Sequence, residues 1–146
     1  CTKNCMLLNV SYNNKAVTKK IEEEVGKPFT LKERWAMNGI GSPKLIITET
    51  SIEIRNLLIL DSNRDVCNIE MRPNGIIIGF RSLLETYALI IPYYKLSIYK
   101  GQASVYSIYR DQYFIKVASD TKAVQKFFKK IMDYKADNAS TSIEDL

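Results

Sequence analysis

Histidine is absent from this chain of 146 residues, and cysteine is scarce. Without histidine, the chain lacks the side chain that usually activates a nucleophilic serine or cysteine, so Ser-His and Cys-His mechanisms are excluded. The three cysteines, Cys1, Cys5 and Cys67, are too few for the common structural zinc sites, which need a full set of Cys or His ligands. We therefore expect a protein without a catalytic site, a metal centre or a cofactor.

Long apolar runs are also missing. A membrane-spanning helix needs roughly 18 consecutive apolar residues, whereas the richest apolar run, Tyr87–Ile91, ends at Pro92. The scarcity of cysteine favours a reducing compartment, because a domain of this length does not need disulfides to fold. We therefore expect a cytoplasmic location. An envelope lipoprotein anchored at Cys1 is the alternative, since mature bacterial lipoproteins begin with a cysteine.

The overall composition is that of a folded protein. Apolar residues make up 46% of the chain and charged residues 25%, as in ordinary globular domains. A chain of this length can bury one hydrophobic core. The formal net charge of +5 favours anionic partners through long-range attraction. Lysine and arginine are nevertheless spread along the chain, so a protein or peptide partner is favoured, then an anionic lipid surface, then nucleic acid.

Residues 1–43 have the pattern of a helical extension packed on the main domain. A short strand is expected within Cys5–Tyr12, followed by a helix over Lys15–Val25. Thr30 and Glu33 have the spacing of a capping box, in which the two side chains satisfy each other's backbone N–H groups. This spacing predicts one or two further helical turns before the chain reaches Lys44.

From Lys44 onwards, β-branched and aromatic runs alternate with turn residues at the spacing of an antiparallel meander or barrel. The sequence predicts tight turns at Arg72–Gly75, where Asn74 and Gly75 can adopt a positive φ, and also at Gly101–Gln102 and Asp111–Gln112. The predicted strands are Lys44–Thr48, Ile52–Leu60, Val66–Arg72, Ile76–Phe80, Thr86–Pro92, Lys95–Lys100, Ser104–Arg110 and Tyr113–Val117.

The last predicted element is an amphipathic helix over Asp120–Tyr134, with Asp120 or Ser119 as its N-cap. One side of this helix is apolar, and five charged residues occupy the other: Lys122, Lys126, Lys129, Lys130 and Asp133. This lysine face suits solvent, and an anionic lipid surface is the alternative. Residues 136–146 are polar and unpatterned, and we expect a flexible tail.

These elements predict an α+β domain, mostly antiparallel β, over residues 44–135. We expect a partly open barrel or sandwich that the C-terminal helix caps, with the N-terminal helix packed against an end or edge. The predicted core contains Leu45, Ile47, Ile52, Ile54, Ile77, Leu96, Ile98, Ile115, Val117, Phe127 and Ile131.

The segment Ile90-Ile91-Pro92-Tyr93-Tyr94-Lys95-Leu96-Ser97-Ile98 leads from an apolar-Pro-aromatic strand into the next strand. This segment, together with a run of strands closed by one helix, resembles the pleckstrin-homology-like (PH-like) domains of bacteria. The resemblance covers residues 44–135. It implies a partly open barrel that binds phosphoinositides, peptides or partner proteins and is rarely an enzyme.

Tyrosines are concentrated between Tyr87 and Tyr113, where basic residues are interleaved with them. Nucleic-acid-binding proteins use such mixtures, because rings stack on bases while cations bind phosphates. A structural explanation is stronger, because tyrosine is favoured in strands, where one side of the ring packs and the hydroxyl reaches water. If this surface binds a ligand, the candidate residues are Tyr93, Tyr94, Lys95, Tyr99 and Arg110.

One motif suggests a metal site but fails in detail. Asp61-Ser-Asn63-Arg-Asp65 has the alternating oxygen ligands that open a calcium-binding EF-hand loop. Val66 and Arg72, however, occupy the positions where such a loop needs glycine and glutamate. A polar hairpin loop is therefore the expected structure of this segment.

The leading hypothesis is a non-catalytic binding module that binds a protein, a peptide or a lipid head group at a barrel mouth or strand edge. The alternative is a nucleic-acid-binding protein that uses the Tyr/Lys strand surface. A third class, an enzyme that uses Asp, Glu, Lys or Tyr, has no support from the spacing of these residues.

Overall fold

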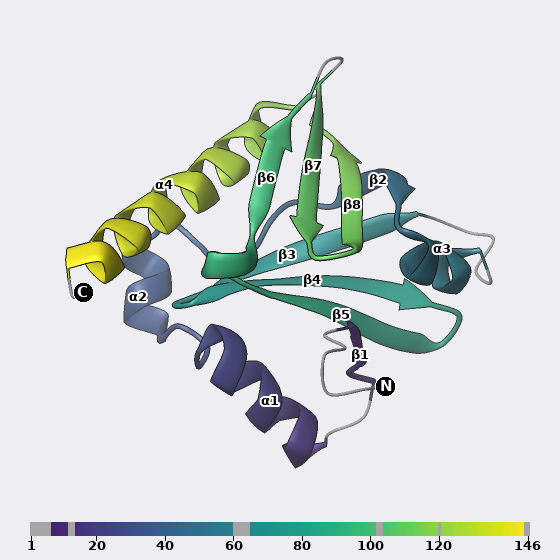
Figure 1. The fold of residues 1–146 in the computed structure, drawn as a ribbon, viewed down its shortest axis with the longest axis horizontal. Helices are drawn as coiled ribbons and strands as arrows, with labels where there is room; N and C mark the ends of the chain where they lie inside the picture. Colours follow the sequence, from purple (N-terminus) through teal and green to yellow (C-terminus); the bar gives the residue numbers. More distant parts are fainter. Residues whose placement is uncertain (1–6, 12–13, 60–64, 102–103, 120, 145–146) are drawn as a thin grey trace.

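The computed structural model describes residues 7–11, 14–59, 65–101, 104–119 and 121–144. Eight strands form one antiparallel sheet in the order β1-β5-β4-β3-β2-β8-β7-β6 (Figure 1). The strands are β1 (Leu7–Asn9), β2 (Leu45–Thr50), β3 (Val66–Arg72), β4 (Gly75–Ser82), β5 (Glu85–Pro92), β6 (Ser97–Lys100), β7 (Val105–Arg110) and β8 (Tyr113–Ala118). The helices are α1 (Lys15–Val25), α2 (Leu31–Ala36), α3 (Ile52–Leu58) and α4 (Lys122–Glu144), with a 3-10 turn η1 (Tyr93–Lys95).

Strand β2 divides the sheet into two layers. Leu45 and Ile46 pair with β3, whereas Ile47 to Thr50 pair with β8, and the register shifts between Ile47 and Glu49. Such an irregularity bends a strand and lets it change partners. The first layer (β1, β5, β4 and β3) therefore crosses the second layer (β8, β7 and β6) at a steep angle (Figure 1). The sheet stays open, with β1 and β6 as its end strands.

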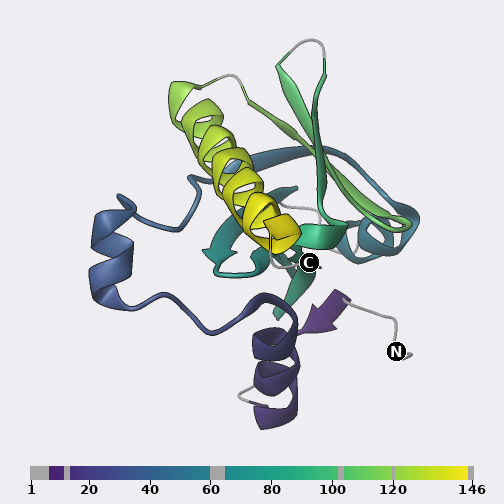
Figure 2. The same cartoon turned by 60° about the vertical axis from the view of Figure 1, so that its left-hand side comes forward.

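The main hydrophobic core lies between the two layers and α4. Figure 2 shows α4 crossing the open side of the sheet. Phe128 on α4 is fully buried, and its ring stacks on Tyr106 of β7 with centroids 4.3 Å apart. Burial of a side chain of this size contributes roughly 1.5–3 kcal/mol to stability. The α+β class, the open antiparallel sheet and the C-terminal helix are thus confirmed, as are eight predicted core residues: Leu45, Ile47, Ile54, Leu96, Ile115, Val117, Phe127 and Ile131.

Three predicted core residues lie elsewhere. Ile52 is exposed on the first turn of α3. Ile77 points to the other face of β4 and packs in a second, smaller core, because successive strand residues alternate between faces. Ile98 is only partly buried, since β6 is an end strand of the sheet.

The predicted strand over Ile52–Leu60 is wrong within the described residues, where the chain forms helix α3 instead. Ile54 and Leu58 are four positions apart and both buried, so a helix brings them to one face against the core. That tertiary packing outweighs the β-propensity of the isoleucines. The other seven predicted strands are present, with ends that differ by at most two residues.

Helix α1 has the predicted bounds, and the Asn14 side chain caps it by accepting the N–H of Ala16 at 2.9 Å. We predicted that this helix packs against an end or edge of the sheet, and its position is different. It packs on the outer face of β4 and β5, where Val25 joins Ala88 and Ile90 in the second core. This face is apolar because Ile77 and Ile90 both point away from the main core.

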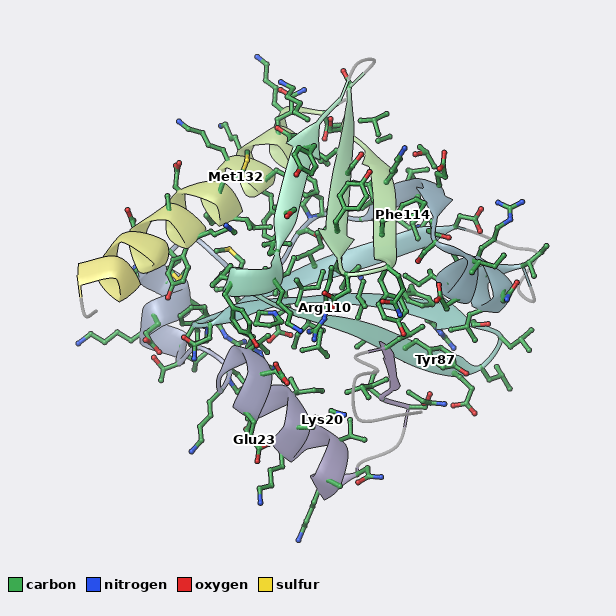
Figure 3. All side chains as sticks on the ribbon, viewed as in Figure 1. Lys20, Glu23, Tyr87, Arg110, Phe114 and Met132 are labelled. Carbon is green, nitrogen blue, oxygen red and sulfur yellow. The ribbon has the colours of Figure 1, made fainter. Side chains whose placement is uncertain are left out.

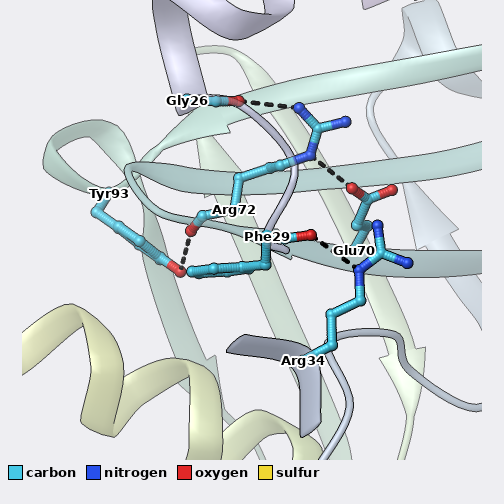
Figure 4. Close-up of polar contacts among 6 residues, drawn as sticks. All are labelled: Gly26, Phe29, Arg34, Glu70, Arg72 and Tyr93. Carbon is cyan, nitrogen blue, oxygen red and sulfur yellow. Dashed lines mark hydrogen bonds and ion pairs between the residues drawn. The ribbon is translucent and has the colours of Figure 1, made fainter. Parts of the chain in front are cut away.

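Arg72 of β3 connects the N-terminal extension to the sheet (Figure 4). Its Nη1 donates to the carbonyl oxygen of Gly26 at 2.9 Å, and its Nε donates to Glu70 Oε2 at 2.5 Å. On α2, the predicted capping box is present, and Arg34 Nε donates to the carbonyl oxygen of Phe29 at 3.1 Å. The Arg72 bond ties the segment before α2 to β3, whereas the capping box and the Arg34 bond stabilise α2 itself.

The turn between β3 and β4 is where the sequence predicts it, but for a different reason. Neither Asn74 nor Gly75 has a positive φ. Gly75 is needed because a Cβ there would overlap the backbone oxygen of Ile91 and lie 2.5 Å from Val25 Cγ1. A close approach between strands and α1, and not a left-handed turn, therefore requires this glycine.

Helix α4 is longer than predicted. It continues past Tyr134 to Glu144, through most of the segment expected to be a flexible tail. At its N-terminus, Thr121 Oγ1 accepts the N–H of Val124 at 3.3 Å. The predicted cap Asp120 lies outside the described residues, as do Cys1, Cys5, Gln102 and most of the predicted calcium-like loop, 61–64. Within the described ranges, no helix has the length and apolar character needed to cross a bilayer.

Candidate binding groove beside an end strand

The edge of β6 that faces away from β7 has unpaired backbone groups. Gly101 donates its N–H to the carbonyl oxygen of Val105, which makes this pair hydrogen-bonded. Because hydrogen-bonded and non-hydrogen-bonded pairs alternate in an antiparallel ladder, the N–H and C=O groups of Ile98 and Lys100 point away from β7. Among the described residues, β6 has no strand partner on this side, and no hydrogen bond of a turn or loop uses these four groups.

A shallow groove of about 360 Å³ runs along this edge, between β6 and α4. Figure 3 labels Met132 on the side of α4 next to β6. Lys135 lines the groove, Lys100 ends β6, and neither forms an ion pair with any described residue. We name this surface the β6 groove; it is lined by Leu96, Ser97, Ile98, Tyr99, Met132, Lys135 and Ala136.

The outer face of the second layer has three aromatic rings side by side, which we name the aromatic row. The ring of Tyr99 lies 5.7 Å from that of Tyr109, which in turn lies 5.7 Å from the ring of Phe114. Lys116 Nζ lies 5.8 Å from the centroid of Phe114 and 3.8 Å from Glu49 Oε2. Tyr99 is 61% exposed, whereas Tyr109 and Phe114 are partly buried.

Among the five predicted site residues, Tyr93 is buried and has a structural role. Its hydroxyl donates to the carbonyl oxygen of Arg72 at 3.1 Å (Figure 4), and its ring lies 5.5 Å from that of Tyr134. Burial, with the nearby Tyr134 as a further cause, raises the pKa of Tyr93 well above its usual range. Tyr93 therefore ties η1 to β3 and offers no surface to a ligand.

Arg110 is also buried, between the two layers of the sheet (Figure 3). Its Nη1 donates to the carbonyl oxygen of Ile90 at 2.7 Å. Ile90 follows Leu89, the last residue of β5 that pairs with a described residue of β1. Its Nε has no hydrogen-bond partner among the described residues and lies 3.5 Å from Asp111 Oδ2. Lys95 Nζ lies 3.7 Å from the same oxygen. Arg110 and Lys95 thus share a carboxylate that links β5 and η1 to the β7–β8 turn.

The structure does not gather the five predicted residues into one site. Lys95 and Arg110 meet at Asp111, and Tyr93 is buried against α4. Tyr94 is 80% exposed on η1. Tyr99 is the predicted residue that lies at both the β6 groove and the aromatic row.

Sequence reasoning missed Met132 and Lys135 in the groove, and Tyr109 and Phe114 in the aromatic row. Part of the aromatic row could have been predicted from the tight turn between β7 and β8, because this turn places Tyr109 and Phe114 opposite each other on neighbouring strands. The groove has no such local signal, since β6 and α4 are far apart in the sequence.

Two buried groups have raised pKa values without forming a site. Burial raises the pKa of the Cys67 thiol to about 12, so this cysteine stays protonated and unreactive at neutral pH. Burial also raises the pKa of Tyr113, with Glu53 and Asp111 acting in the same direction and Arg110 opposing them. Both groups are packed core residues.

Comparison with known proteins gives no further guide. No protein-family model matches the chain, and neither the search of curated proteins nor the search of solved structures found a match. The function must therefore be argued from the chain's own residues.

Proposed function

We propose that this chain is a non-catalytic, PH-like binding module that binds an extended peptide segment of a partner protein along β6. The observation that carries the proposal is the unpaired edge of β6, with the free N–H and C=O groups of Ile98 and Lys100 beside the β6 groove. A peptide that adds as a strand satisfies such groups and gains affinity from main-chain hydrogen bonds.

The surroundings of the edge favour a particular peptide chemistry. Side chains of an added strand alternate between two faces, so one set would enter the β6 groove against Met132 and the other would lie near Tyr99. The unpaired cations of Lys100 and Lys135 favour acidic residues or a carboxylate in the peptide. We expect a ligand with alternating apolar and acidic positions.

The order of elements supports the PH-like part of the proposal. Strands β2 to β5 form one meander, β6 to β8 form a second, and α4 follows across the open side. A run of strands closed by one C-terminal helix is the pattern on which the resemblance over residues 44–135 rests, and α3 between β2 and β3 departs from it. The scarcity of cysteine supports a cytoplasmic location.

Two variants of Lys100 test the strand-addition mechanism. Because its N–H points to the free edge, Lys100→Pro removes one donor and obstructs an added strand while leaving the ladder with β7 intact. Lys100→Gln keeps the donor and removes only the charge. The probe is a displayed library of random peptides, selected on the wild-type chain and then titrated against both variants.

We expect selected peptides to lose at least tenfold in affinity for Lys100→Pro, since a lost edge bond and a steric clash act together. Lys100→Gln should weaken acidic peptides only a few fold. Thermal melting checks that both variants fold. Failure of any peptide to enrich, or equal binding by Lys100→Pro and wild type, would contradict the proposal.

A second candidate function is binding of single-stranded nucleic acid, which the aromatic row favours. Bases stack on rings displayed by a sheet, and Lys116 and the net charge of +5 suit phosphates. Labelled oligo(U) and oligo(dT) are the probes. This function predicts affinity that falls steeply with salt and is lost on Tyr99→Ala. Salt-independent or absent binding would reject it.

A further inference from the structure

The cross-strand pairs of β6 show which of its side chains lie on the groove side. Lys100 is opposite Tyr106, which is buried in the main core. Ile98 is opposite Ile108, which is fully buried in the same core. Because residues opposite each other in a ladder share a face, Lys100 and Ile98 both lie on the groove side. Tyr99, between them in the sequence, lies on the other face, where its ring begins the aromatic row.

The free edge determines which kind of pair an added strand would form at each of these residues. The N–H and C=O groups of Ile98 and Lys100 point outward, so both residues would form hydrogen-bonded pairs with an antiparallel strand. Tyr99 would then be in a non-hydrogen-bonded pair, in which the two Cα atoms are only about 4.5 Å apart. The side chain opposite Tyr99 therefore has the closest cross-strand contact of the three.

The aromatic row ends at this free edge. Tyr99 is 61% exposed, and Tyr109 and Phe114 continue the row away from the edge, with 5.7 Å between neighbouring ring centroids. An aromatic side chain opposite Tyr99 would extend the row by a fourth ring. Aromatic cross-strand pairs stabilise a sheet beyond the area that they bury. The surface therefore favours an aromatic residue at this position of the ligand.

The groove side has a charged end and an apolar middle. Lys100, at the end of β6, forms no ion pair with a described residue, so an acidic side chain opposite it would supply the missing partner. Ile98 packs against the main core, and Met132 of α4 lines the groove beside it. An aliphatic side chain opposite Ile98 would cover both of these residues.

Two arguments favour an antiparallel direction for the added strand. Every strand pair among the described residues is antiparallel, and antiparallel pairs are slightly more stable per residue than parallel ones. An antiparallel strand also gives Tyr99 the close pair that suits two rings, whereas the hydrogen bonds of a parallel ladder are evenly spaced. In this direction, the ligand meets Lys100 first, then Tyr99 and then Ile98.

We infer, on the basis of the proposed strand addition along β6, that the ligand contains an acidic, an aromatic and an aliphatic residue in that order from its N-terminus. The acidic residue pairs with Lys100, and the aromatic ring extends the aromatic row from Tyr99. The aliphatic side chain covers Ile98 in the β6 groove. The reversed order would place the acidic residue opposite Ile98 and leave Lys100 without an acidic partner.

Lys100→Glu tests the order of the residues. The probe is the displayed library of random peptides, selected separately on the wild-type chain and on this variant. We expect peptides from the wild type to share an acidic residue directly before an aromatic one. Peptides from Lys100→Glu should have lysine or arginine at that position instead, because like charges opposite each other repel. Lys126→Glu is the matched control, since Lys126 is exposed on α4 and lines a different hollow.

A synthetic peptide tests the direction of the added strand. It has the enriched sequence, and a second peptide has the same three residues in reversed order. The enriched sequence should bind the wild-type chain roughly tenfold more tightly than the reversed one, because only the enriched order pairs its charge with Lys100.

Tyr99→Ala tests the aromatic contact. This variant should bind the enriched peptide roughly threefold to tenfold more weakly than the wild type. Library selection on it should no longer enrich an aromatic residue after the acidic one. Trp35→Ala is the matched control, because Trp35 is 87% exposed on α2 and does not line the β6 groove. This control should leave the affinity unchanged, and thermal melting checks that all variants fold.

The results distinguish failure of this inference from failure of the proposed function. Peptides that depend on the β6 edge lose binding in Lys100→Pro. If such peptides have the acidic residue after the aromatic one, or share no aromatic residue, the inference is wrong and strand addition stands. Selection of the same peptides by Lys100→Glu and wild type, or equal binding by Tyr99→Ala and Trp35→Ala, has the same meaning. Failure of any peptide to enrich, or equal binding by Lys100→Pro and wild type, overturns both.

Discussion

Replacing Gly75 by alanine tests how closely the first layer and α1 approach each other. The new Cβ would overlap the carbonyl oxygen of Ile91 and lie 2.5 Å from Val25 Cγ1 and 2.7 Å from Pro92 Cα. Two of these atoms belong to the backbone of β5 and cannot rotate away. Overpacking costs typically 1–3 kcal/mol, and we expect about 3 kcal/mol here. The melting temperature should fall by about 10 °C.

Gly79→Ala is the matched control for this variant. Gly79 lies on the same face of the same strand, but the nearest atom to its added Cβ would be the Tyr87 carbonyl oxygen at 3.9 Å, an ordinary contact. We expect a change in the free energy of unfolding within about 0.5 kcal/mol, because the added methyl group meets no close atom and alanine also restricts the unfolded chain. Thermal and urea unfolding, followed by circular dichroism, measure both variants.

A second-site change shows which contact causes the loss. Val25→Ala removes the Cγ1 atom that a Cβ at position 75 would meet, but it leaves the overlap with the backbone of β5. Val25→Ala should therefore lower the free energy of unfolding less in the Gly75→Ala variant than in the wild type. A double-mutant cycle measures this coupling. Equal stability of Gly75→Ala and Gly79→Ala would refute the close approach of β4, β5 and α1.

Three further predictions follow from the core and its titrating groups. Tyr93→Phe should cost about 1 kcal/mol at neutral pH through its lost hydrogen bond. Above pH 10, a tyrosine in the unfolded chain ionises whereas buried Tyr93 does not, so the free energy of unfolding of the wild type falls as the pH rises. Urea unfolding should show a smaller fall for Tyr93→Phe, which lacks this ionising group. Truncation after Ser119 removes α4 from the core and should abolish cooperative thermal unfolding; a retained transition would contradict the role of α4. In a Cys1→Ser, Cys5→Ser variant, Cys67 should react with a thiol reagent only in denaturant, and rapid labelling of the native protein would disprove its burial.

The sequence predicted elements whose signals are local. The cap at Asn14 and the capping box at Thr30 act within a few residues, and both are present. Alternating apolar residues defined most strands because one side of each strand faces the core. Helix α3 was missed because its two buried residues, Ile54 and Leu58, suit a helix only when the core lies on one side of it. That information is tertiary.

The candidate site was less predictable than the fold. Tyr93, Tyr94 and Lys95 are consecutive, yet η1 buries the first, exposes the second and pairs the third with Asp111. Arg110 has the charge of a ligand-binding residue, but its position at the end of β7 buries it between the two layers. The importance of β6 depends on strand order, which residue spacing alone does not determine.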